Sequence, residues 1–289
     1  MVLTNAITDI VYKVSDEFIN KINVSNWYDL EIKLKEQEKI YQSPAGSPAN
    51  VGFSASVLGL KVAIQGTLGN DDLAEEYSKK IVNYELFDDI KRTNGKSGVC
   101  YTFITPDGER HFKAVLNDAP KFDLSNNVFV PKVFHTSVYE VESNPVKVLE
   151  HIANLKSKGV KVSLDLADHR ICKKLKHHVL QILELTDILF TSSQEYHVLY
   201  NGVPSGNISQ EVLCMKMGAH GSCILHRDGN RIVIRPVKAK LVNTNGAGDN
   251  YAAGFLYSYL KGFNLETCGV IASDVAARVC AQVSSCLDK

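Results

Sequence analysis

The pattern of hydrophobic and polar residues in the second half of the chain predicts alternating strands and helices. Short apolar runs alternate with longer segments in which apolar residues recur at helical spacing. The predicted strands are 133–137, 160–165, 187–190, 214–217 and 222–226, and the predicted helices are about 144–158 and 173–184. Because parallel strands need helical crossovers, this alternation favours an α/β fold: a mostly parallel central sheet with helices on both faces.

The first half of the chain gives a less regular pattern. It predicts a short first strand over residues 1–9, a helix over 51–60, a strand over 61–66, a helix from Leu73, and a solvated helix face over the charged run 31–39. Asp9 and Asp165 each end a predicted strand. Such an Asp either forms a turn or binds a ligand, because open α/β sheets bind ligands at the carboxyl edge of their strands.

Residues 97–115 have the pattern of a β-hairpin. Two strand-like runs, 97–105 and 110–115, flank a turn that contains Asp107-Gly108. The hairpin is compatible with a lid over a binding site or with a simple edge hairpin.

The most informative stretch is a glycine-containing turn near the C-terminus. Strand-like runs at 231–234 and 241–242 precede it, and an amphipathic helix follows and ends near Lys261 and Gly262. Gly246, Ala247 and Gly248 therefore lie where a helix begins, with unpaired backbone N–H groups that can bind a phosphate. Asp249 in the same turn would repel a phosphate unless it accepts a proton, which indicates a general base.

The turn also has a purely structural interpretation, and two other glycine motifs do not fit this chain. A Gly-x-Gly turn is often only a tight connection, and an Asp at a helix start is often only a cap. The Rossmann fingerprint requires a third glycine where this chain has Tyr251. A P-loop ending in Gly95-Lys96-Ser97 would require a glycine where this chain has Ile90.

Composition narrows the class of protein. The 289 residues are enough for a single domain, and 32 basic residues balance 32 acidic ones, which argues against a nucleic-acid partner. There is no apolar run long enough to cross a bilayer and no signal-peptide pattern at the N-terminus, so we expect no membrane association. Seven cysteines without a Cys-x-x-Cys pair indicate reduced thiols and a cytoplasmic location.

The glycine turn resembles the C-terminal signature of the ribokinase-like (PfkB) carbohydrate and nucleoside kinases, Asp-Thr-x-Gly-Ala-Gly-Asp. The resemblance implies that Gly246, Ala247 and Gly248 form an anion hole and that Asp249 is the catalytic base. It also places Asn243 and Thr244 at the ATP site, although Asn243 replaces the usual Asp.

A second motif, Ser43-Pro44-Ala45-Gly46-Ser47-Pro48-Ala49-Asn50, resembles the Gly-Gly-Ser-Pro-Ala-Asn signature of the same family, with Ala45 in place of the first glycine. The resemblance implies that Gly46 and Asn50 contact the acceptor. The opening of the chain is similar to the adenosine-kinase-like branch, in which Asp9 would accept hydrogen bonds from two sugar hydroxyl groups. Without the resemblance, Asn50 is equally well explained as a helix cap.

Two further segments resemble the nucleotide-binding parts of this family. Ser192 and Glu195 occupy the positions of an Asn-x-x-Glu motif, which implies that Glu195 helps to hold Mg²⁺, and Ser192 replaces the Asn. Lys216, Gly218 and Gly221 match a turn that lies against the phosphates of ATP. A capped helix start also explains Glu195, and two glycines in a strand connection are common without any ligand.

Together these resemblances imply one ribokinase-like α/β domain over residues 1–289, with a small β lid from segments about 11–42 and 96–118. We expect a kinase that uses Mg²⁺ and ATP, with a monovalent cation as a further option, to phosphorylate a primary hydroxyl of an adenosine-like nucleoside or a sugar. It would act as a monomer or a homodimer. The alternative is a degenerate member that binds a sugar or nucleoside with little phosphoryl transfer, which Ala45, Ser192 and Asn243 motivate.

Overall fold

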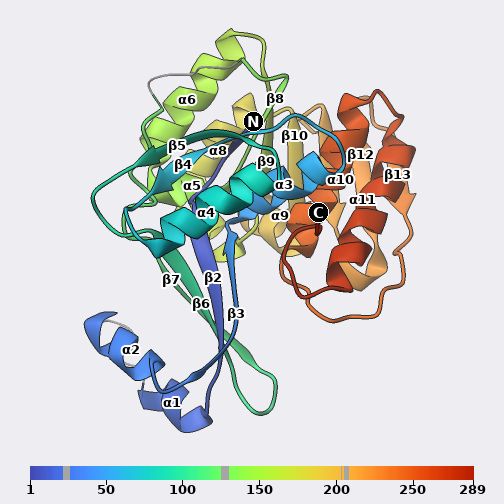
Figure 1. Ribbon diagram of the computed structural model, residues 1–289. Helices are drawn as coiled ribbons and strands as arrows, with labels where there is room; N and C mark the ends of the chain where they lie inside the picture. Colours follow the sequence, from blue (N-terminus) through green and yellow to red (C-terminus); the bar gives the residue numbers. More distant parts are fainter. Residues whose placement is uncertain (22–26, 125–129, 203, 205–207) are drawn as a thin grey trace.

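The computed structural model describes residues 1–21, 27–124, 130–202, 204 and 208–289, and the side chains of residues 20, 21, 27–29 and 31 are not described. Within these residues the chain forms one nine-stranded and one four-stranded sheet (Figure 1). In spatial order, the large sheet consists of β13 (Arg231–Ile234), β12 (Ser222–His226), β11 (Val212–Lys216), β10 (Ile188–Ser192), β9 (Lys161–Asp165), β8 (Val133–Ser137), β1 (Val2–Leu3), β4 (Ala63–Leu68) and β5 (Phe87–Arg92).

The large sheet is parallel except at one edge, where β12 pairs antiparallel with both β11 and β13. The other neighbouring strands run parallel, as expected for strands joined by helical crossovers. The mostly parallel α/β sheet predicted from the sequence is thus confirmed.

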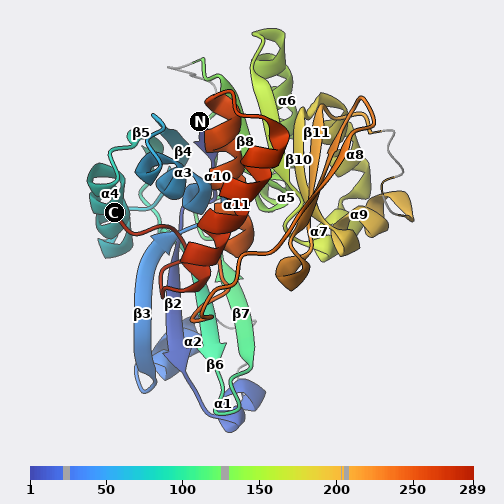
Figure 2. The same cartoon turned by 90° about the vertical axis from the view of Figure 1, so that its right-hand side faces the viewer.

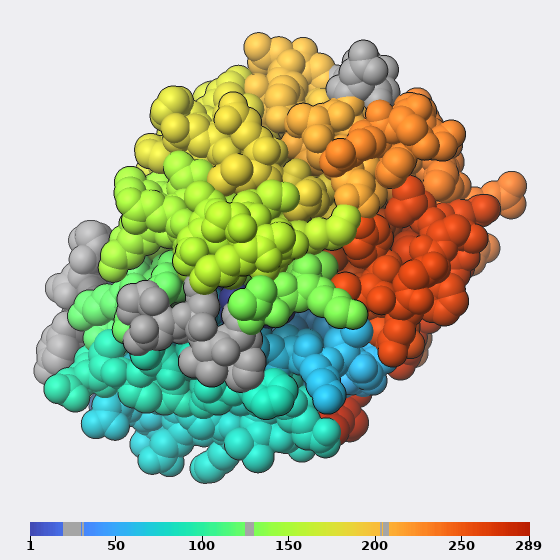
Figure 3. Space-filling view, turned by 90° about the horizontal axis from the view of Figure 1, so that it is seen from above, coloured from blue at the N-terminus to red at the C-terminus, as the bar shows by residue number. Residues whose placement is uncertain are grey.

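Helices cover both faces of the large sheet. One face packs against α3 (Ser47–Val57), α4 (Asp72–Asn83), α10 (Ala247–Leu260) and α11 (Leu265–Cys280). The other face packs against α5 (Val138–Ser143), α6 (Pro145–Ser157), α7 (His169–Lys174), α8 (Lys176–Leu185) and α9 (Ser193–Tyr200). From above, the green-to-yellow and orange-to-red segments form one continuous surface (Figure 3).

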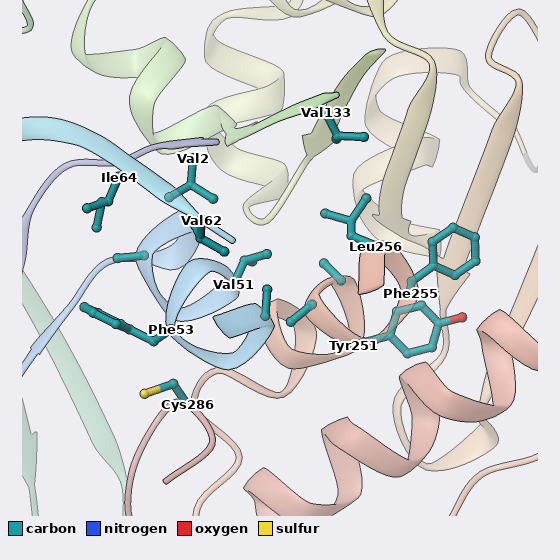
Figure 4. Close-up of a cluster of buried hydrophobic side chains, with 14 of the residues drawn as sticks. Val2, Val51, Phe53, Val62, Ile64, Val133, Tyr251, Phe255, Leu256 and Cys286 are labelled. Carbon is teal, nitrogen blue, oxygen red and sulfur yellow. The ribbon is translucent and has the colours of Figure 1, made fainter. Parts of the chain in front are cut away.

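Helices α3 and α10 lie side by side although about two hundred residues separate them. Val51 and Phe53 of α3 and Tyr251, Phe255 and Leu256 of α10 all belong to one buried cluster (Figure 4). Removing such apolar area from water contributes about 25 cal/mol per Å². This packing sets the distance between the N-terminal turns of the two helices.

The small sheet projects from the large one, with strand order β3 (Glu38–Ala45), β2 (Ile7–Lys13), β6 (Gly98–Ile104) and β7 (Arg110–Val115) (Figures 1 and 2). One of its faces is covered by α1 (Asp16–Lys21) and α2 (Trp27–Leu34) through an apolar cluster that includes Ile10, Leu30 and Phe103. Because side chains alternate along a strand, Asp9, Val11 and Thr102 lie on the opposite face.

Several predicted boundaries were wrong. The first strand, expected over residues 1–9, is two strands in two sheets, because the chain leaves the large sheet after β1 and enters the small sheet at Ile7. Asp9 therefore lies within β2, opposite Ser43 of β3 and Cys100 of β6, and not at the end of a strand. The large sheet is buried on both faces, whereas β2 of the small sheet buries alternate residues. Because β1 has only two residues, it is too short to show where one pattern gives way to the other.

Other differences have local causes. The expected strand at 241–242 is absent, because the N–H groups of Val242 and Asn243 donate to the Cys280 carbonyl at the end of α11. The last helix, α11, ends at Cys280, and the chain then turns to bury Cys286 and Leu287.

Further boundaries differ from the prediction, and two elements were not predicted. The charged run 31–39 is divided between α2 and β3, and the helix expected over 51–60 begins already at Ser47. The single helix expected over 173–184 is α7 followed by α8, with no Gly or Pro in the sequence to mark the break. The pattern did not predict β5 or α5, which are short or largely exposed.

The predicted lid segments overlap the four strands of the small sheet, but β2 begins earlier, at Ile7, and β3 extends to Ala45. Residues 22–26 of the first segment lie outside the described residues. Among the described residues, none of the helices combines the length and the apolar character that crossing a bilayer requires.

Gly46 joins the small sheet to α3 and gives the first prediction. Its φ is +118°, and an added Cβ would lie 2.6 Å from both the Asn5 carbonyl oxygen and Thr4 Oγ1. Gly46→Ala should therefore lower the free energy of unfolding by about 2–4 kcal/mol in urea denaturation, through strain and overlap together. Gly59→Ala is the control, because Gly59 also has a positive φ but no atom lies within 4 Å of its Cβ position. Equal losses in the two variants would contradict the close contact.

Candidate active site

The first turn of α10 has the geometry expected for an anion site. Gly246 precedes the helix with φ +77°, and a Cβ there would lie 2.1 Å from the Ser285 carbonyl oxygen, so only glycine fits. The Ala247 N–H donates to the Thr244 carbonyl at 3.3 Å. The N–H groups of Gly248 and Asp249 have no backbone acceptor in the described part of the chain, as is usual for the first helical turn. We call residues 246–249 the anion turn.

Asp249 is held by two hydrogen bonds from α3. Ser47 Oγ donates to one carboxylate oxygen at 2.7 Å, and Asn50 Nδ2 donates to the other at 2.9 Å. Burial raises the pKa of Asp249 to about 7, and the charge of Asp165 adds to the rise, whereas the two hydrogen bonds and Lys216 lower it. A carboxyl group with a pKa near neutrality can both accept and release a proton at physiological pH.

The side chain of Asn50 bonds to protein groups through both its amide nitrogen and its oxygen. Its amide donates to Asp249, and its oxygen accepts from Ser285 Oγ at 3.2 Å. Buried Asn250 donates to the carbonyls of Gly246 at 2.7 Å and Ser285 at 2.8 Å. The C-terminal segment around Ser285 thus fastens the anion turn to α3.

A cavity of about 150 Å³ lies between the inner face of the small sheet and the loop before the anion turn. It is lined by Asp9, Val11, Ile40, Tyr41, Thr102, Ile104, Arg110, Val242, Asn243, Asn245, Val283 and Ser285. Burial raises the pKa of Asp9 to about 6, and Lys80 opposes this rise. The cavity therefore combines a carboxylate with several aliphatic side chains.

Arg110 connects the small sheet to the loop before the anion turn. Its guanidinium donates to Asn243 Oδ1 at 2.9 Å and to Asn245 Oδ1 at 3.3 Å. Asn243 in turn donates to the Val283 carbonyl at 2.8 Å. These contacts keep the small sheet over the cavity.

A buried ionic cluster lies on the other side of the anion turn. Lys216 Nζ donates to both carboxylate oxygens of Asp165, at 2.6 and 2.8 Å, and lies 3.1 Å from where a Cβ of Gly248 would be. Burial alone would lower the pKa of Lys216, but the charges of Asp165 and Glu195 outweigh burial and raise it.

Ser192 and Glu195 hold each other at the start of α9. The Ser192 N–H donates to the Glu195 carboxylate at 2.7 Å, and Ser192 Oγ accepts from the Glu195 N–H at 3.3 Å. Ser192 and Glu195 therefore form a capping box, in agreement with the sequence-based alternative that Glu195 only caps a helix. Burial raises the pKa of Glu195, while Lys216 lowers it. Among the described residues, there is no group of three or more His, Cys, Asp or Glu side chains that could hold a metal ion.

The turn after Lys216 is more exposed than the rest of the site. Gly218 and Gly221 both have positive φ, and a Cβ on Gly221 would lie 2.1 Å from the Ile234 carbonyl oxygen. Close packing against β13 is therefore enough to explain Gly221.

The structure brings together most of the residues that the sequence singled out. Asn50, the anion turn and Lys216 form one set of contacts, and Asp9 and Asn243 line the adjoining cavity. A larger hollow of about 410 Å³, next to Gly69, Asp71 and Arg92, contains none of them.

Sequence reasoning missed Ser47, Arg110 and Ser285. Ser47 had a usable signal, since it lies one helical turn before Asn50 and so faces the same side of α3. The contacts of Arg110 and Ser285 join residues 133 and 235 positions apart, for which the sequence carries no local signal.

Comparisons with known proteins give independent evidence on family and fold. The family model of the pfkB family carbohydrate kinases matches residues 19–288. An uncharacterized sugar kinase from Archaeoglobus fulgidus is 28% identical over 251 residues, which cover 77% of this chain and 92% of the relative. A 5-dehydro-2-deoxygluconokinase from Listeria innocua is 26% identical over 264 residues, 83% of this chain and 81% of the relative. The crystal structure of adenosine kinase from Sinorhizobium meliloti superimposes with a TM-score of 0.87 at 22% identity, covering 99% of this chain and 94% of that one.

The pKa of Asp249 makes a prediction about stability. A raised pKa in the folded state means that the folded chain binds the proton more tightly than the unfolded chain. The resulting stabilisation is complete below pH about 4 and is lost as the pH rises through about 7. The wild-type protein should therefore lose stability relative to Asp249→Asn between pH 5 and pH 8, measured by urea denaturation. Asp72→Asn, at an exposed position in α4, is the control. A difference between wild type and Asp249→Asn that does not change with pH would contradict the assignment.

Proposed function

Because the chain belongs to the pfkB family of carbohydrate kinases, we propose that it transfers the γ-phosphoryl group of ATP to a primary hydroxyl group of a nucleoside, with Asp249 as the general base. Members of this family are phosphotransferases with alcohol acceptors that use ATP. The observation that carries the proposal is the Asp249 carboxylate, with a pKa of about 7, next to the free N–H groups of the anion turn.

In the proposed reaction, the Asp249 carboxylate takes the proton of the acceptor hydroxyl group as its oxygen attacks the γ-phosphorus. A bond forms between the acceptor oxygen and the γ-phosphorus, and the bond from that phosphorus to the β–γ bridging oxygen breaks, which releases ADP. The N–H groups of Gly248 and Asp249 stabilise the negative charge on the transferred group. Since the amides are already in place, little reorganisation is needed.

The donor chemistry near α9 fits a hydrated Mg²⁺. Mg²⁺ takes one or two carboxylates and keeps several waters, and Glu195 supplies one buried carboxylate beside Ser192. When bound with ATP, the ion would neutralise phosphate charge. Ser192, Lys216, Gly218, Gly221, Asn243 and Thr244 are proposed to lie along the nucleotide. A monovalent cation remains a prediction of the family resemblance.

The cavity under the small sheet supports a nucleoside as the acceptor. A carboxylate such as Asp9 can accept hydrogen bonds from two vicinal hydroxyl groups of a ribose, while Val11, Ile40 and Ile104 offer apolar contacts to a base. The structural similarity to an adenosine kinase agrees with this choice. A free sugar is the second candidate, because the two sequence relatives described above are sugar kinases by name.

The cavity of about 150 Å³ is smaller than the usual ligand site of roughly 300–1,000 Å³. We therefore propose that the small sheet acts as a lid that opens for the acceptor and closes to exclude water. The lid would bend where β1 passes into β2 and at Gly46, which are in contact.

The remaining expectations are part of this proposal. The balanced charge and the seven free cysteines support a cytoplasmic enzyme that acts on small molecules and not on nucleic acid. That the enzyme acts as a monomer or a homodimer is part of the same proposal.

A panel assay tests the proposal and separates it from a degenerate protein that only binds its ligand. ADP formation is measured with Mg²⁺–ATP and a set of nucleosides and sugars, and binding of the same compounds is measured by calorimetry. Turnover with a nucleoside supports the proposal. Binding without turnover for every compound would favour the degenerate alternative.

Replacement of the proposed base gives a prediction about rate. Asp249→Asn should lower kcat by about three orders of magnitude or more, because no group remains to accept the proton, while acceptor affinity changes little. Steady-state kinetics and calorimetry measure the two effects. Asp72→Asn is the matched control. Wild-type turnover in Asp249→Asn would remove Asp249 from this role.

The hydrogen bond from Ser47 gives a prediction about pH dependence. In the wild type, kcat/KM should rise with pH through about 7 as Asp249 loses its proton. Because the Ser47 hydrogen bond lowers the pKa of Asp249, Ser47→Ala should move this acidic limb to higher pH. Ser56→Ala, in the same helix but bonded to the Phe53 carbonyl, should leave the limb in place. An unshifted limb in Ser47→Ala would show that another group controls it.

A further inference from the structure

Lys216 and Asp165 form an ion pair at the carboxyl edge of the large sheet, next to the anion turn. Lys216 ends β11 and Asp165 ends β9, with β10 between them. The Lys216 side chain is 18% exposed and that of Asp165 2%. Burying two charges is costly, so a buried ion pair is weak evidence for a stabilising role.

The register of the strands explains how the pair reaches the anion turn. Asp165 lies level with Phe190, and Phe190 lies level with Cys214, so their side chains share the face of the sheet that packs against α10. Lys216 is two residues beyond Cys214 and shares this face. Its ammonium group therefore lies between the Asp165 carboxylate and the first turn of α10, beside Gly248.

This position is electrostatically unusual. The N-terminus of a helix carries partial positive charge and disfavours a nearby cation. The negative charge of Asp165 offsets the positive charge of Lys216. An anion bound at the anion turn would stabilise the ammonium group further. An ammonium group has three N–H donors, and the two oxygens of Asp165 accept from it at 2.6 and 2.8 Å. The third donor has no acceptor within the described ranges of the chain and can serve a further group.

We propose that Asp165 is a positioning residue that holds Lys216 Nζ against the anion turn, where the ammonium donates a hydrogen bond to the phosphoryl group being transferred. This inference rests on the proposed kinase function. In this proposal Asp165 does not contact the substrate. Asp165 acts through Lys216, because it fixes the direction in which the third N–H of the ammonium group points.

The groups facing Lys216 define the expected pH behaviour. These are Asp165 from β9, Glu195 from α9, Asp249 from α10 and His135 from β8. Without Asp165, Lys216 loses its direct partner and remains buried near the helix N-terminus. The ammonium should then lose its proton at lower pH.

The test compares Asp165→Asn with Asp168→Asn. Asp165→Asn should weaken binding of a non-hydrolysable ATP analogue and lower kcat, each by about tenfold or more, because a hydrogen bond from a charged donor is misplaced. The alkaline limb of kcat/KM for ATP should move to lower pH, while acceptor affinity is unchanged. Asp168 also forms an ion pair, with Arg170 at 2.6 Å, and caps α7. Asp168→Asn, which keeps an oxygen that can cap α7, should keep wild-type ATP binding and pH profile.

A double-mutant comparison shows whether Asp165 acts through Lys216. In a Lys216→Gln background, Asp165→Asn should cause no further loss of kcat or analogue affinity. The double variant has no buried charge without a partner. It can therefore be compared directly with Lys216→Gln if Asp165→Asn alone misfolds. Wild-type behaviour of Asp165→Asn, or a further tenfold loss in the Lys216→Gln background, would overturn the inference. Failure of the wild-type protein itself to bind the analogue or phosphorylate any acceptor would instead overturn the proposed function.

Discussion

The site depends on the packing of α3 against α10. The hydrogen bonds from Ser47 and Asn50 to Asp249 join residues about two hundred positions apart in the chain, and they exist because the two helices share one buried apolar cluster. The anion turn is held from the other side by the Ser285 carbonyl, which accepts from Asn250 and leaves no room for a side chain on Gly246. The fold thus fixes a carboxylate beside N–H groups that have no backbone acceptor in the described residues.

Burial then determines the chemistry of the charged groups. Burial raises the pKa values of Asp249, Asp9 and Glu195, while Lys216 supplies the positive charge near two of them. Charged groups lie on two sides of the anion turn: Asp9 in the cavity under the small sheet, and the Lys216–Asp165 ion pair at the carboxyl edge of the large sheet. This separation agrees with an acceptor that offers hydroxyl groups on one side and a phosphate donor on the other.

The sequence predicted the parts of the site that rest on local rules. Gly246 and Gly262 bound α10 because each has a positive φ, and the Asp107-Gly108 turn marked the hairpin of the small sheet. Asp9 could not be placed, because the two residues of β1 are too few to show where the large sheet ends and the small sheet begins. The link from Arg110 to Asn243 and the partners of Asn50 depend on tertiary packing, which one sequence without homologues does not specify. A capping box and a metal site both require a Glu at position 195, so the sequence alone could not distinguish these two roles.

The central claim is that Asp249 receives the proton of an acceptor hydroxyl group held between the small sheet and the anion turn. A crystal structure with the best acceptor from the panel and a non-hydrolysable ATP analogue tests it most directly. The account predicts the reacting hydroxyl oxygen about 2.6–3.2 Å from the Asp249 carboxylate. It also predicts that the sugar hydroxyls bind Asp9 and that the γ-phosphate contacts the N–H groups of Gly248 and Asp249. An acceptor bound away from Asp249, or a γ-phosphate without contact to the anion turn, would contradict it.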